Sequence, residues 1–204
     1  MFLKIHPDNP NPRKINTVVE CLQDGGVIIY PSDTIYGFGC DIYNKKAVGR
    51  IANIKGINIK KQKFSFICSS LSNISRFTKP ISNETYKLMK RNLPGPFTFI
   101  LNANNNIPKI FKSNRKTLGI RVPKHNIPLE IVKKLENPII SSSVRDRDKI
   151  IEYSTDPEIM YDKLKNLVDI VIDGGFSGNI PSTIIDCTKS DFEIIRQGKG
   201  NIIC

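Results

Sequence analysis

An apolar run that ends abruptly in polar residues is the feature that most constrains the fold of this chain. Residues 27–30 read Val-Ile-Ile-Tyr, which is typical of a strand that is buried on both faces. Pro31 ends the run, and Ser32, Asp33 and Thr34 follow it at once. Open α/β sheets bind their ligands at strand ends of this kind. The stretch therefore favours a binding site over a plain polar turn.

Two glycines, Gly37 and Gly39, come soon after this polar triplet. Glycine lets the backbone turn tightly or approach another group closely. We therefore expect either a tight turn at these residues or a close approach to something bound.

Helical periodicity recurs along the chain. The first helix buries residues spaced i, i+3, i+4 and i+7, namely Ile15, Val18, Val19 and Leu22. It ends at Asp24 and the glycine pair 25–26, which suits a left-handed cap. Further helices are expected from the cap Asn44 to Lys55, from Ser82 or Asn83 to before Pro94, over 126–135, and after a capping box of Thr155 and Glu158.

Apolar stretches between these helices predict strands. They cover residues 64–68, 97–101, 118–123, 138–143, 168–172, 182–188 and 192–196. Strands that alternate with helices argue for an α/β sheet that is at least partly parallel. The last two strands have no helix between them, so we expect an antiparallel portion. The first fifteen residues contain three prolines and should form an irregular or edge segment.

Length and composition fit one globular domain. The chain has 204 residues, of which 39% are hydrophobic and 25% charged, and this suits a sizeable core. No apolar run approaches the ~20 residues that span a membrane, and the N-terminus lacks a signal-peptide pattern. We therefore expect a cytoplasmic protein with no membrane partner. The five cysteines lack a Cys-x-x-Cys pair and only two histidines are present, which predicts reduced core cysteines and no structural metal site.

The charge balance is compatible with an anionic partner. A net charge of +12 favours binding of a nucleic acid or of nucleotide phosphates. Lysines spread over many faces would give the same total in a chain that is rich in Lys, Asn and Ile. Both interpretations stay open at this point.

Small hydroxyl residues and two arginines mark several predicted strands. The hydroxyl clusters are Ser32 with Thr34, Ser141 to Ser143, and Ser182 with Thr183. Such residues often satisfy turn backbone, but three clusters in one chain favour a shared polar pocket. Arg121 and Arg196 interrupt apolar strands and would be costly to bury unpaired. Either an acidic residue such as Asp173 neutralises them, or they face an anionic ligand.

Common nucleotide-binding and hydrolase motifs are absent from the sequence. It contains no Gly-x4-Gly-Lys-Ser/Thr loop and no Gly-x-Gly-x-x-Gly fingerprint. Two histidines leave no plausible Ser-His-Asp set. Scattered Lys, Arg and hydroxyl side chains would have to hold a nucleotide.

Seven segments occur in the order of a known family. They are residues 26–39, 55–56, 94–98, 121–125, 138–143, 182–186 and 195–198. Together they resemble the YrdC-like family, the threonylcarbamoyl-AMP synthases, over nearly the whole chain. The most specific part is Pro-Ser-Asp-Thr-x-Tyr-Gly at 31–37. Several segments are most similar to the YciO-type branch, among them Phe-Ser-Phe-Ile-Cys at 64–68.

The resemblance implies the YrdC-like fold and a reaction. The fold is a single α/β domain over residues 1–204, with a core of about 13–200 and no appended second domain. Helices pack on a twisted open mixed sheet that has a basic concave face. The reaction converts L-threonine, bicarbonate and ATP, with Mg²⁺, into threonylcarbamoyl-AMP and pyrophosphate for threonylcarbamoyladenosine in tRNA. Such catalysis requires positioning and charge neutralisation but no covalent nucleophile.

The resemblance also assigns residues to roles. L-threonine would contact Ser32, Thr34, Arg121 and Ser182. The nucleotide would contact Lys55, Lys60, Thr98, Ser141, Ser143 and Arg196. Lys55 and Arg145 would act in catalysis.

Two motifs depart from the family pattern. The synthases carry Lys-x-Arg and Ser-x-Asn, whereas this chain has Lys-Gly-Ile at 55–57 and Ser-Val-Arg at 143–145. We predict that Arg145, with Lys60 or Lys61, partly replaces the missing charge, although arginine lacks the acceptor oxygen of asparagine. The alternative functions are a YciO-type protein with weak or different nucleotide chemistry, and a protein that binds tRNA or double-stranded RNA.

Overall fold

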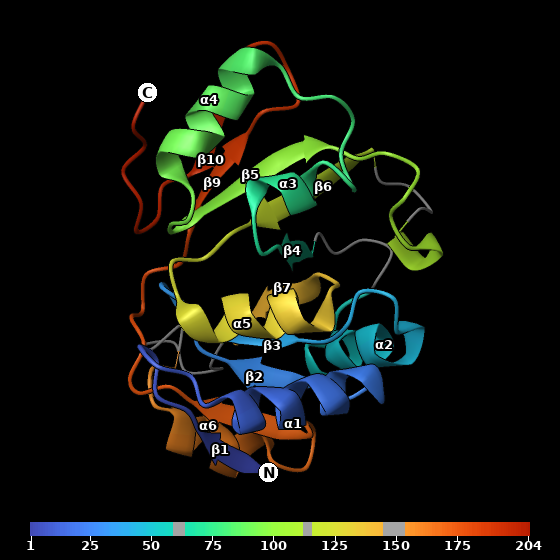
Figure 1. The fold of residues 1–204 in the computed structure, drawn as a ribbon, viewed down its shortest axis with the longest axis vertical. Coiled ribbons are helices and arrows are strands. Elements are labelled where there is room, and N and C mark those ends of the chain that lie inside the picture. Colours follow the sequence, from blue (N-terminus) through green and yellow to red (C-terminus); the bar gives the residue numbers. More distant parts are fainter. Residues whose placement is uncertain (59–63, 112–115, 145–153) are drawn as a thin grey trace.

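The apolar stretches of the sequence become the strands of one mixed sheet (Figure 1). A computed structural model describes residues 1–58, 64–111, 116–144 and 154–204. Within these residues ten strands lie side by side. Their spatial order is β1 (Phe2–Lys4), β8 (Ile170–Asp173), β2 (Ile28–Tyr30), β3 (Gly37–Gly39), β7 (Ile139–Ser143), β4 (Ser65–Ile67), β6 (Thr117–Arg121), β5 (Phe97–Asn102), β9 (Thr183–Asp186) and β10 (Glu193–Arg196).

Strand directions confirm the prediction of a mixed sheet. The parallel pairs are β1–β8, β2–β8, β4–β6 and β5–β9. The antiparallel pairs are β2–β3, β3–β7, β4–β7, β5–β6 and β9–β10. The last two strands are antiparallel as expected, and β1 forms one edge of the sheet, as expected for the first segment.

The helices begin and end close to the predicted residues. Helix α1 (Pro12–Gln23) buries its four periodic apolar residues, and Gly25 follows its end at a φ of 85°. The others are α2 (Lys45–Ile54), α3 (Leu71–Ile74), α4 (Asn83–Asn92), the 3-10 helix η1 (Lys109–Phe111), α5 (Asn126–Leu135) and α6 (Pro157–Leu164). Neither α3 nor η1 has a pattern that predicted it. In the described ranges, no helix combines the length and apolar character that a membrane crossing requires.

The N-terminus of α6 corrects one prediction. Its cap is Asp156, whose Oδ1 accepts a hydrogen bond from the backbone N–H of Glu158 at 2.8 Å. Thr155 lies one residue too early to serve, because Pro157 is the first helical residue. The capping box of Thr155 and Glu158 is therefore wrong, and Pro157 stands in the first turn, where proline is tolerated.

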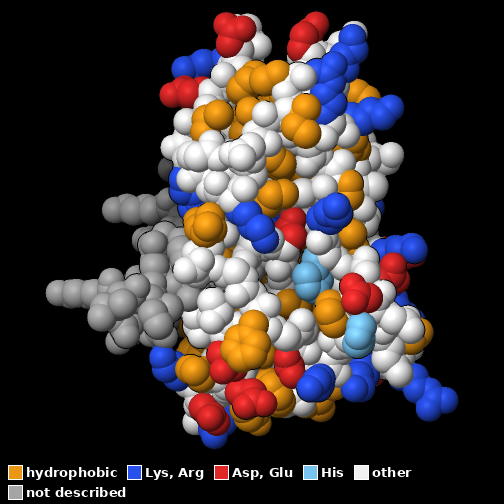
Figure 2. All heavy atoms as spheres, turned by 90° about the vertical axis from the view of Figure 1, so that its left-hand side faces the viewer, with side chains coloured by type: hydrophobic (Ala, Val, Ile, Leu, Met, Phe, Trp, Pro, Cys, Tyr) orange, Lys and Arg blue, Asp and Glu red, His pale blue; other side chains and the backbone are white. Residues whose placement is uncertain are grey.

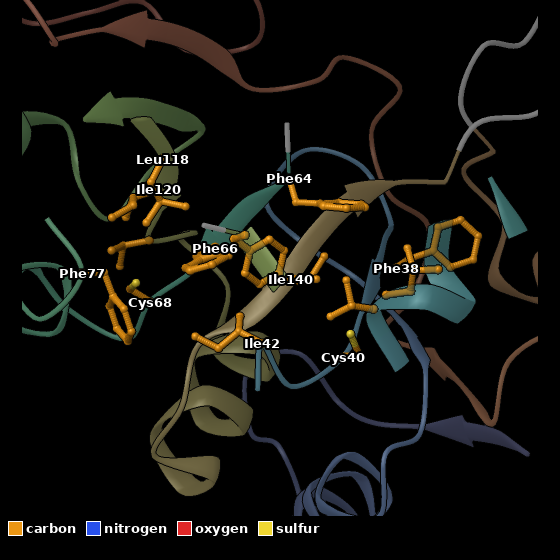
Figure 3. Packing of buried hydrophobic residues seen from close by; sticks show 14 of the residues in the cluster. Phe38, Cys40, Ile42, Phe64, Phe66, Cys68, Phe77, Leu118, Ile120 and Ile140 are labelled. Atoms are coloured by element: carbon orange, nitrogen blue, oxygen red, sulfur yellow. The ribbon is translucent and has the colours of Figure 1, made fainter. Parts of the chain in front are cut away.

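Alternate residues of the central strands build the main hydrophobic core. Ile29, Phe38, Ile140, Phe66 and Ile120 come from five strands, and all are buried. The register pairs Ile29 with Phe38, and Phe66 with both Ile140 and Ile120, so each pair shares a face of the sheet. Figure 3 shows Phe66 and Ile140 packed side by side, with Ile120 and Phe38 on either side of them in this layer.

The other face of the same strands is divided into two halves. In one half, Ile28, Ile67 and Ile139 are buried under α1 and α5, which lie side by side in Figure 1. Two residues away along each of β2, β4 and β7, the side chains become Tyr30, Ser65 and Ser141. A residue two positions along a strand keeps the same face. The uncovered half is therefore formed by small and polar side chains.

Strand β3 explains the two glycines of the opening motif. Gly37 pairs with Tyr30, and Gly39 pairs with Ile28. A Cβ at Gly39 would lie 2.9 Å from Cε1 of Tyr30, and a Cβ at Gly37 would lie 3.4 Å from its hydroxyl oxygen. The phenol ring therefore extends across β3 where side chains are missing. The expected tight turn is wrong, and the close approach is that of Tyr30.

Three of the five cysteines occupy the core as expected, and Cys21 is half-buried. Cys40, Cys68 and Cys187 are buried and free, and burial raises the pKa of Cys68 to about 12. Cys204 is exposed, so a core position is wrong for this residue.

Two glycine-to-alanine substitutions are expected to change stability in opposite directions. Gly39→Ala would drive a Cβ against the buried ring of Tyr30, which should cost about 1–3 kcal/mol. Gly49 lies within α2, where a Cβ would meet nothing within 4 Å, so Gly49→Ala should gain about 0.5–1 kcal/mol. Urea unfolding of the two variants measures the difference. Equal stabilities would contradict the packing of Tyr30 on β3.

Candidate functional site

One large cavity lies over the uncovered half of the sheet. Its volume is about 960 Å³, which is the size of pockets that hold small ligands and cofactors. Residues paired across neighbouring strands point to the same face, and such pairs line the floor. They are Tyr30 with Gly37, Gly37 with Ser143, Ser65 with Ser141, Thr98 with Ile184, and Ile184 with Arg196.

The cavity is basic. Its described lining includes Lys55, Arg121, Lys163 and Arg196 and no acidic side chain. On the face in Figure 2 the charges are mixed, since Lys and Arg lie among Asp and Glu. Positive charge gathered in a cleft attracts anions. The basic concave face that the resemblance implies is thus confirmed.

Arg121 is held in place by the polar triplet that follows β2. Its Nη2 donates to Oδ1 of Asp33, to Oγ1 of Thr34 at 2.7 Å and to Oγ of Ser32 at 3.4 Å. Oδ2 of Asp33 accepts from the backbone N–H of Lys124 at 2.9 Å. The side chains of Arg121 and Asp33 are only 6% and 10% exposed, so this ion pair is shielded from solvent.

The partner of Arg121 corrects a second prediction. Asp173 was the expected acid, but its Oδ1 accepts from the backbone N–H of Gly175 at 2.9 Å. Asp33 neutralises Arg121 instead. The guanidinium nevertheless lines the cavity, and its Nε has no hydrogen-bond partner among the described residues. Both interpretations of Arg121 therefore hold in part: it is paired, and one edge remains for a ligand.

Ser32 and Thr34 take different places. Ser32 lines the cavity, and its hydroxyl donates to the carbonyl oxygen of Ile35 at 2.6 Å. Thr34 is fully buried behind Arg121 and is not part of the described lining. The contacts of Thr34 therefore orient Arg121. Its direct contact with a ligand stays a prediction.

A connected group of polar residues forms the far end of the floor. Thr98 Oγ1 and Ser182 Oγ lie 2.8 Å apart, and Arg196 Nη2 donates to the carbonyl oxygen of Ser182 at 2.7 Å. All three residues line the cavity. Ser182, which was predicted to contact L-threonine, thus touches Thr98 and Arg196, which were predicted to contact the nucleotide. The residues predicted for the two substrates therefore meet here.

Thr183, the last residue of the hydroxyl clusters, belongs to the fold. Its hydroxyl donates to the carbonyl oxygen of Gly200 at 2.6 Å and accepts from the backbone N–H groups of Gly198 and Gly200. The side chain is fully buried. It ties the C-terminal segment to β9 and has no contact with the cavity.

Lys55 reaches the cavity from the C-terminal end of α2. Its Nζ donates to the carbonyl oxygen of Ser143 at 2.5 Å and lies 5.9 Å from the centre of the Phe38 ring. Ser141 and Ser143 line the floor beside it. The structure therefore brings Lys55 and these two predicted nucleotide residues together.

The phosphate motifs are only partly described. Ile57 lines the cavity close to Lys55, at the position where the family resemblance expects arginine. Lys60, Lys61 and Arg145 lie outside the described residues. Compensation by Arg145 stays a prediction.

Between α2 and α6 the cavity becomes apolar. Its lining there is Ile54, Ile57, Met160, Leu164 and Leu167, with Lys163 among them. A flat ring system would bury apolar area in this part without losing hydrogen bonds. The polar floor and this apolar part together suit a ligand with both kinds of surface.

Two buried tyrosines line the cavity and differ in their hydrogen bonds. Tyr36 Oη donates to the carbonyl oxygen of Gly175 at 2.7 Å and accepts from the N–H of Gly174 at 3.2 Å. Tyr30 Oη has no hydrogen-bond partner among the described residues. Burial raises the pKa of Tyr30 to about 12 and that of Tyr36 as well, so both phenols stay protonated.

Several lining residues lie in a pattern of alternating apolar and polar side chains that the strand predictions did not take into account. Ser65 and Thr98 each stand between two phenylalanines, and Gly119 and Arg121 alternate with Leu118 and Ile120. This period of two separates a core face from a polar face. Reading each strand as one continuous apolar run concealed Ser65 and Tyr30.

The described residues contain no group of three or more His, Cys, Asp or Glu side chains that could hold a metal ion. The lining offers hydroxyl oxygens for contacts with a metal that is bound to a ligand.

The family model Sua5/YciO/YrdC, described as telomere recombination, matches residues 20–198. The chain belongs to this family. Membership agrees with the ten-stranded mixed sheet and with the segments on which the resemblance was based.

Relatives include proteins with and without an assigned activity. The uncharacterized protein YciO of Escherichia coli (strain K12) is 38% identical over 98% of this chain and 97% of its own length, and its crystal structure has a TM-score of 0.90 to this chain. The threonylcarbamoyl-AMP synthase of Coxiella burnetii (strain RSA 493) is 32% identical over 79% of this chain and 86% of its own length. A structure of Pyrococcus abyssi Sua5 complexed with L-threonine has a TM-score of 0.87 at 25% identity, over 97% of this chain and 57% of that one.

Proposed function

We propose that the protein forms threonylcarbamoyl-AMP from L-threonine, bicarbonate and ATP. The main support is a basic cavity in which the guanidinium of Arg121 and the ammonium of Lys55 border one hydroxyl-lined floor. A carboxylate and a triphosphate would each find a cation there. A relative in Coxiella burnetii bears the name of this activity, and the related Sua5 was crystallised with L-threonine.

L-Threonine would bind where the cavity meets Arg121. The carboxylate would accept from Nη1 of Arg121, since the contacts with Asp33, Ser32 and Thr34 all use Nη2. Ser32 would lie beside it. The linked hydroxyls of Thr98 and Ser182 can exchange hydrogen bonds with the amino acid. This arrangement would leave the amino group directed along the floor.

ATP would extend from the floor into the apolar part. The phosphates would lie near Lys55 and the hydroxyls of Ser141 and Ser143, and the base would lie against Ile54 and Leu164 between α2 and α6. Lysine interacts with phosphates as a point charge. Arg196 would add charge at the other end of the floor.

The chemistry proceeds in two balanced steps. The threonine nitrogen forms a bond to the bicarbonate carbon, and water leaves with one oxygen of that carbon, which gives a carbamate. A carbamate oxygen then forms a bond to the α-phosphorus as the bond to the β-phosphate oxygen breaks. Pyrophosphate leaves with that electron pair. The residues contribute by holding the reactants close together and by neutralising phosphate charge.

Mg²⁺ would accompany the ATP phosphates. Its role would be to neutralise charge on the departing pyrophosphate. Hydroxyl oxygens of Ser141 and Ser143 line the same region and would hold the hydrated metal through water.

Pyrophosphate release tests the proposed function. Purified protein with ATP and Mg²⁺ should release pyrophosphate only when both L-threonine and bicarbonate are present. Omission of threonine, and carbon dioxide-free buffer without bicarbonate, serve as matched controls. Release that is independent of either substrate would overturn the assignment.

Ile57 favours a second candidate, in which nucleotide chemistry is weak or uses another substrate. An apolar side chain at this position leaves the neighbourhood of Lys55 with less charge than the family motif implies. In that case ATP would still protect the protein against heating, but pyrophosphate release would stay at background. Binding of tRNA or double-stranded RNA is the other candidate, and its affinity should fall steeply with salt.

A further inference from the structure

Two buried hydrogen-bond donors in the cavity lack a partner among the described residues. They are Tyr30 Oη and Arg121 Nε. The residues are 1% and 5% exposed, so bulk water does not satisfy either group. Buried polar atoms are rarely left unpaired, and each such atom calls for an explanation.

Tyr30 is held in this position by the sheet itself. Its ring occupies the space over Gly37 and Gly39, and a Cβ at Gly39 would collide with it. Gly37 pairs with Ser143 on the next strand, β7, so the hydroxyl points from β2 toward β7. Burial raises the pKa of the phenol, and hydrogen bonding toward the hydroxyl of Ser141 lowers it by less. The two hydroxyls are nevertheless too poorly placed for Ser141 to count as a close partner of Tyr30 Oη.

Arg121 approaches the same place from the other side. Its charge also lowers the pKa of Tyr30, and the carboxylate of Asp33 raises it, as does the buried thiol of Cys40. Nη2 of Arg121 is already occupied by Asp33, Ser32 and Thr34. Nε is buried and makes no such contact, so it remains for a ligand other than the threonine carboxylate.

Both unpartnered groups carry a proton to donate, although a phenol oxygen can also accept a hydrogen bond. An arginine N–H has no acceptor role, and a phenol that stays protonated offers its proton to an acceptor. The described lining has no carboxylate that could accept these protons. The site therefore fits an oxyanion, in which at most one oxygen carries a proton and the others accept hydrogen bonds.

We propose that Tyr30 Oη and Arg121 Nε hold bicarbonate on the floor of the cavity, and that Tyr30 orients it for attack by an amino group. This proposal rests on the proposed function. Bicarbonate places three oxygens on one carbon and has no further substituent, so it can reach two buried donors that a whole amino acid or a phosphate chain would approach less closely. Donors on its oxygens also draw electron density from the carbon, which favours the formation of the C–N bond.

Tyr30→Phe is the decisive variant because it removes only the hydroxyl. The ring that fills the space over Gly37 and Gly39 remains. Tyr36→Phe is the matched control, since it removes the same atom from a neighbouring cavity tyrosine whose hydroxyl is fully hydrogen-bonded. Thermal unfolding is followed with sodium bicarbonate, and with sodium chloride at the same ionic strength, both alone and with L-threonine present.

Bicarbonate should raise the melting temperature of the wild-type protein. Tyr30→Phe should lose most of this rise, while its melting temperature in chloride stays equal to or above that of the wild type, because an unpartnered buried hydroxyl has been removed. Tyr36→Phe should melt at a lower temperature in chloride and keep the rise. Where pyrophosphate is released, Tyr30→Phe should raise the KM for bicarbonate about tenfold and leave the KM for ATP unchanged.

Three results would overturn the proposal. One is the absence of any bicarbonate effect on the wild type under both conditions, and another is an unchanged effect in Tyr30→Phe. The third comes from parallel measurements with L-threonine and inorganic phosphate. If Tyr30→Phe lost the protection given by either of these ligands but kept the protection given by bicarbonate, the donors would belong to a site for another oxyanion. Melting temperatures do not depend on turnover, so bicarbonate protection without pyrophosphate release would overturn only the proposed function.

Discussion

Arg121→Ala is expected to lower the free energy of unfolding by about 3 kcal/mol and to abolish turnover. The substitution leaves the carboxylate of Asp33 in a site where it is only 10% exposed. It also removes the donor to Ser32 and Thr34. Loss of one member of a buried ion pair is costly because the other charge stays desolvated.

Arg50→Ala provides the matched control for this prediction. Arg50 makes an ion pair with Asp169 at 2.8 Å, but the two side chains are 42% and 41% exposed. Solvent screening reduces the contribution of such a pair to about 0–1 kcal/mol. Urea denaturation of both variants gives the comparison. If Arg121→Ala were no less stable than Arg50→Ala, Arg121 and Asp33 could not form the buried pair described here.

Lys55→Met is expected to reduce threonine-dependent pyrophosphate release by at least about 100-fold with little change in stability. Methionine keeps the apolar stem that lies against Phe38 but lacks the ammonium group. The carbonyl oxygen of Ser143 loses one donor. The phosphates would then meet the hydroxyls of the floor without the nearest cation.

Lys46→Met controls for the loss of one positive charge on the same helix. Lys46 is exposed on α2 and lies outside the described cavity lining. Its replacement should leave the rate within about twofold, as expected for a distant surface charge. Similar rates of pyrophosphate release for the two variants would show that Lys55 does not act in catalysis. If Lys55→Met lowered both the rate and the free energy of unfolding, the role of Lys55 would be structural.

Patterns with a strong local cause were predicted well. Ile15, Val18, Val19 and Leu22 lie on one face of α1 because their spacing matches the helical repeat. Asn44 and Ser82 cap α2 and α4 because their side chains can accept backbone protons. Thr155 and Asp156, however, are adjacent, and the side chain of either could cap a helix. Only the backbone geometry decides between them.

The partner of Arg121 could not be predicted because it depends on strand order. Asp33 follows β2 and Asp173 ends β8, and these two strands are neighbours in the sheet. The fold turns the triplet after β2 toward β6, where Arg121 lies. A single sequence contains no direct information on such long-range pairings.

The hydroxyl clusters predicted a shared pocket, but not its floor. Ser32, Ser141 and Ser182 do line one cavity. The floor arises because strands that are distant in sequence share a register, for example Ser65 with Ser141 and with Gly119. Tyr30 was assigned to the core for the same reason: its apolar neighbours concealed a hydroxyl that faces the cavity.

Isotope incorporation tests the central claim most directly. The protein is incubated with ¹³C-labelled bicarbonate, L-threonine, ATP and Mg²⁺, and the quenched products are separated and weighed by mass spectrometry. We expect an AMP conjugate that contains both threonine and one labelled carbon, formed in step with pyrophosphate. Pyrophosphate and AMP without any labelled threonine conjugate, or no conversion of ATP, would contradict the assignment of this cavity to threonylcarbamoyl-AMP synthesis.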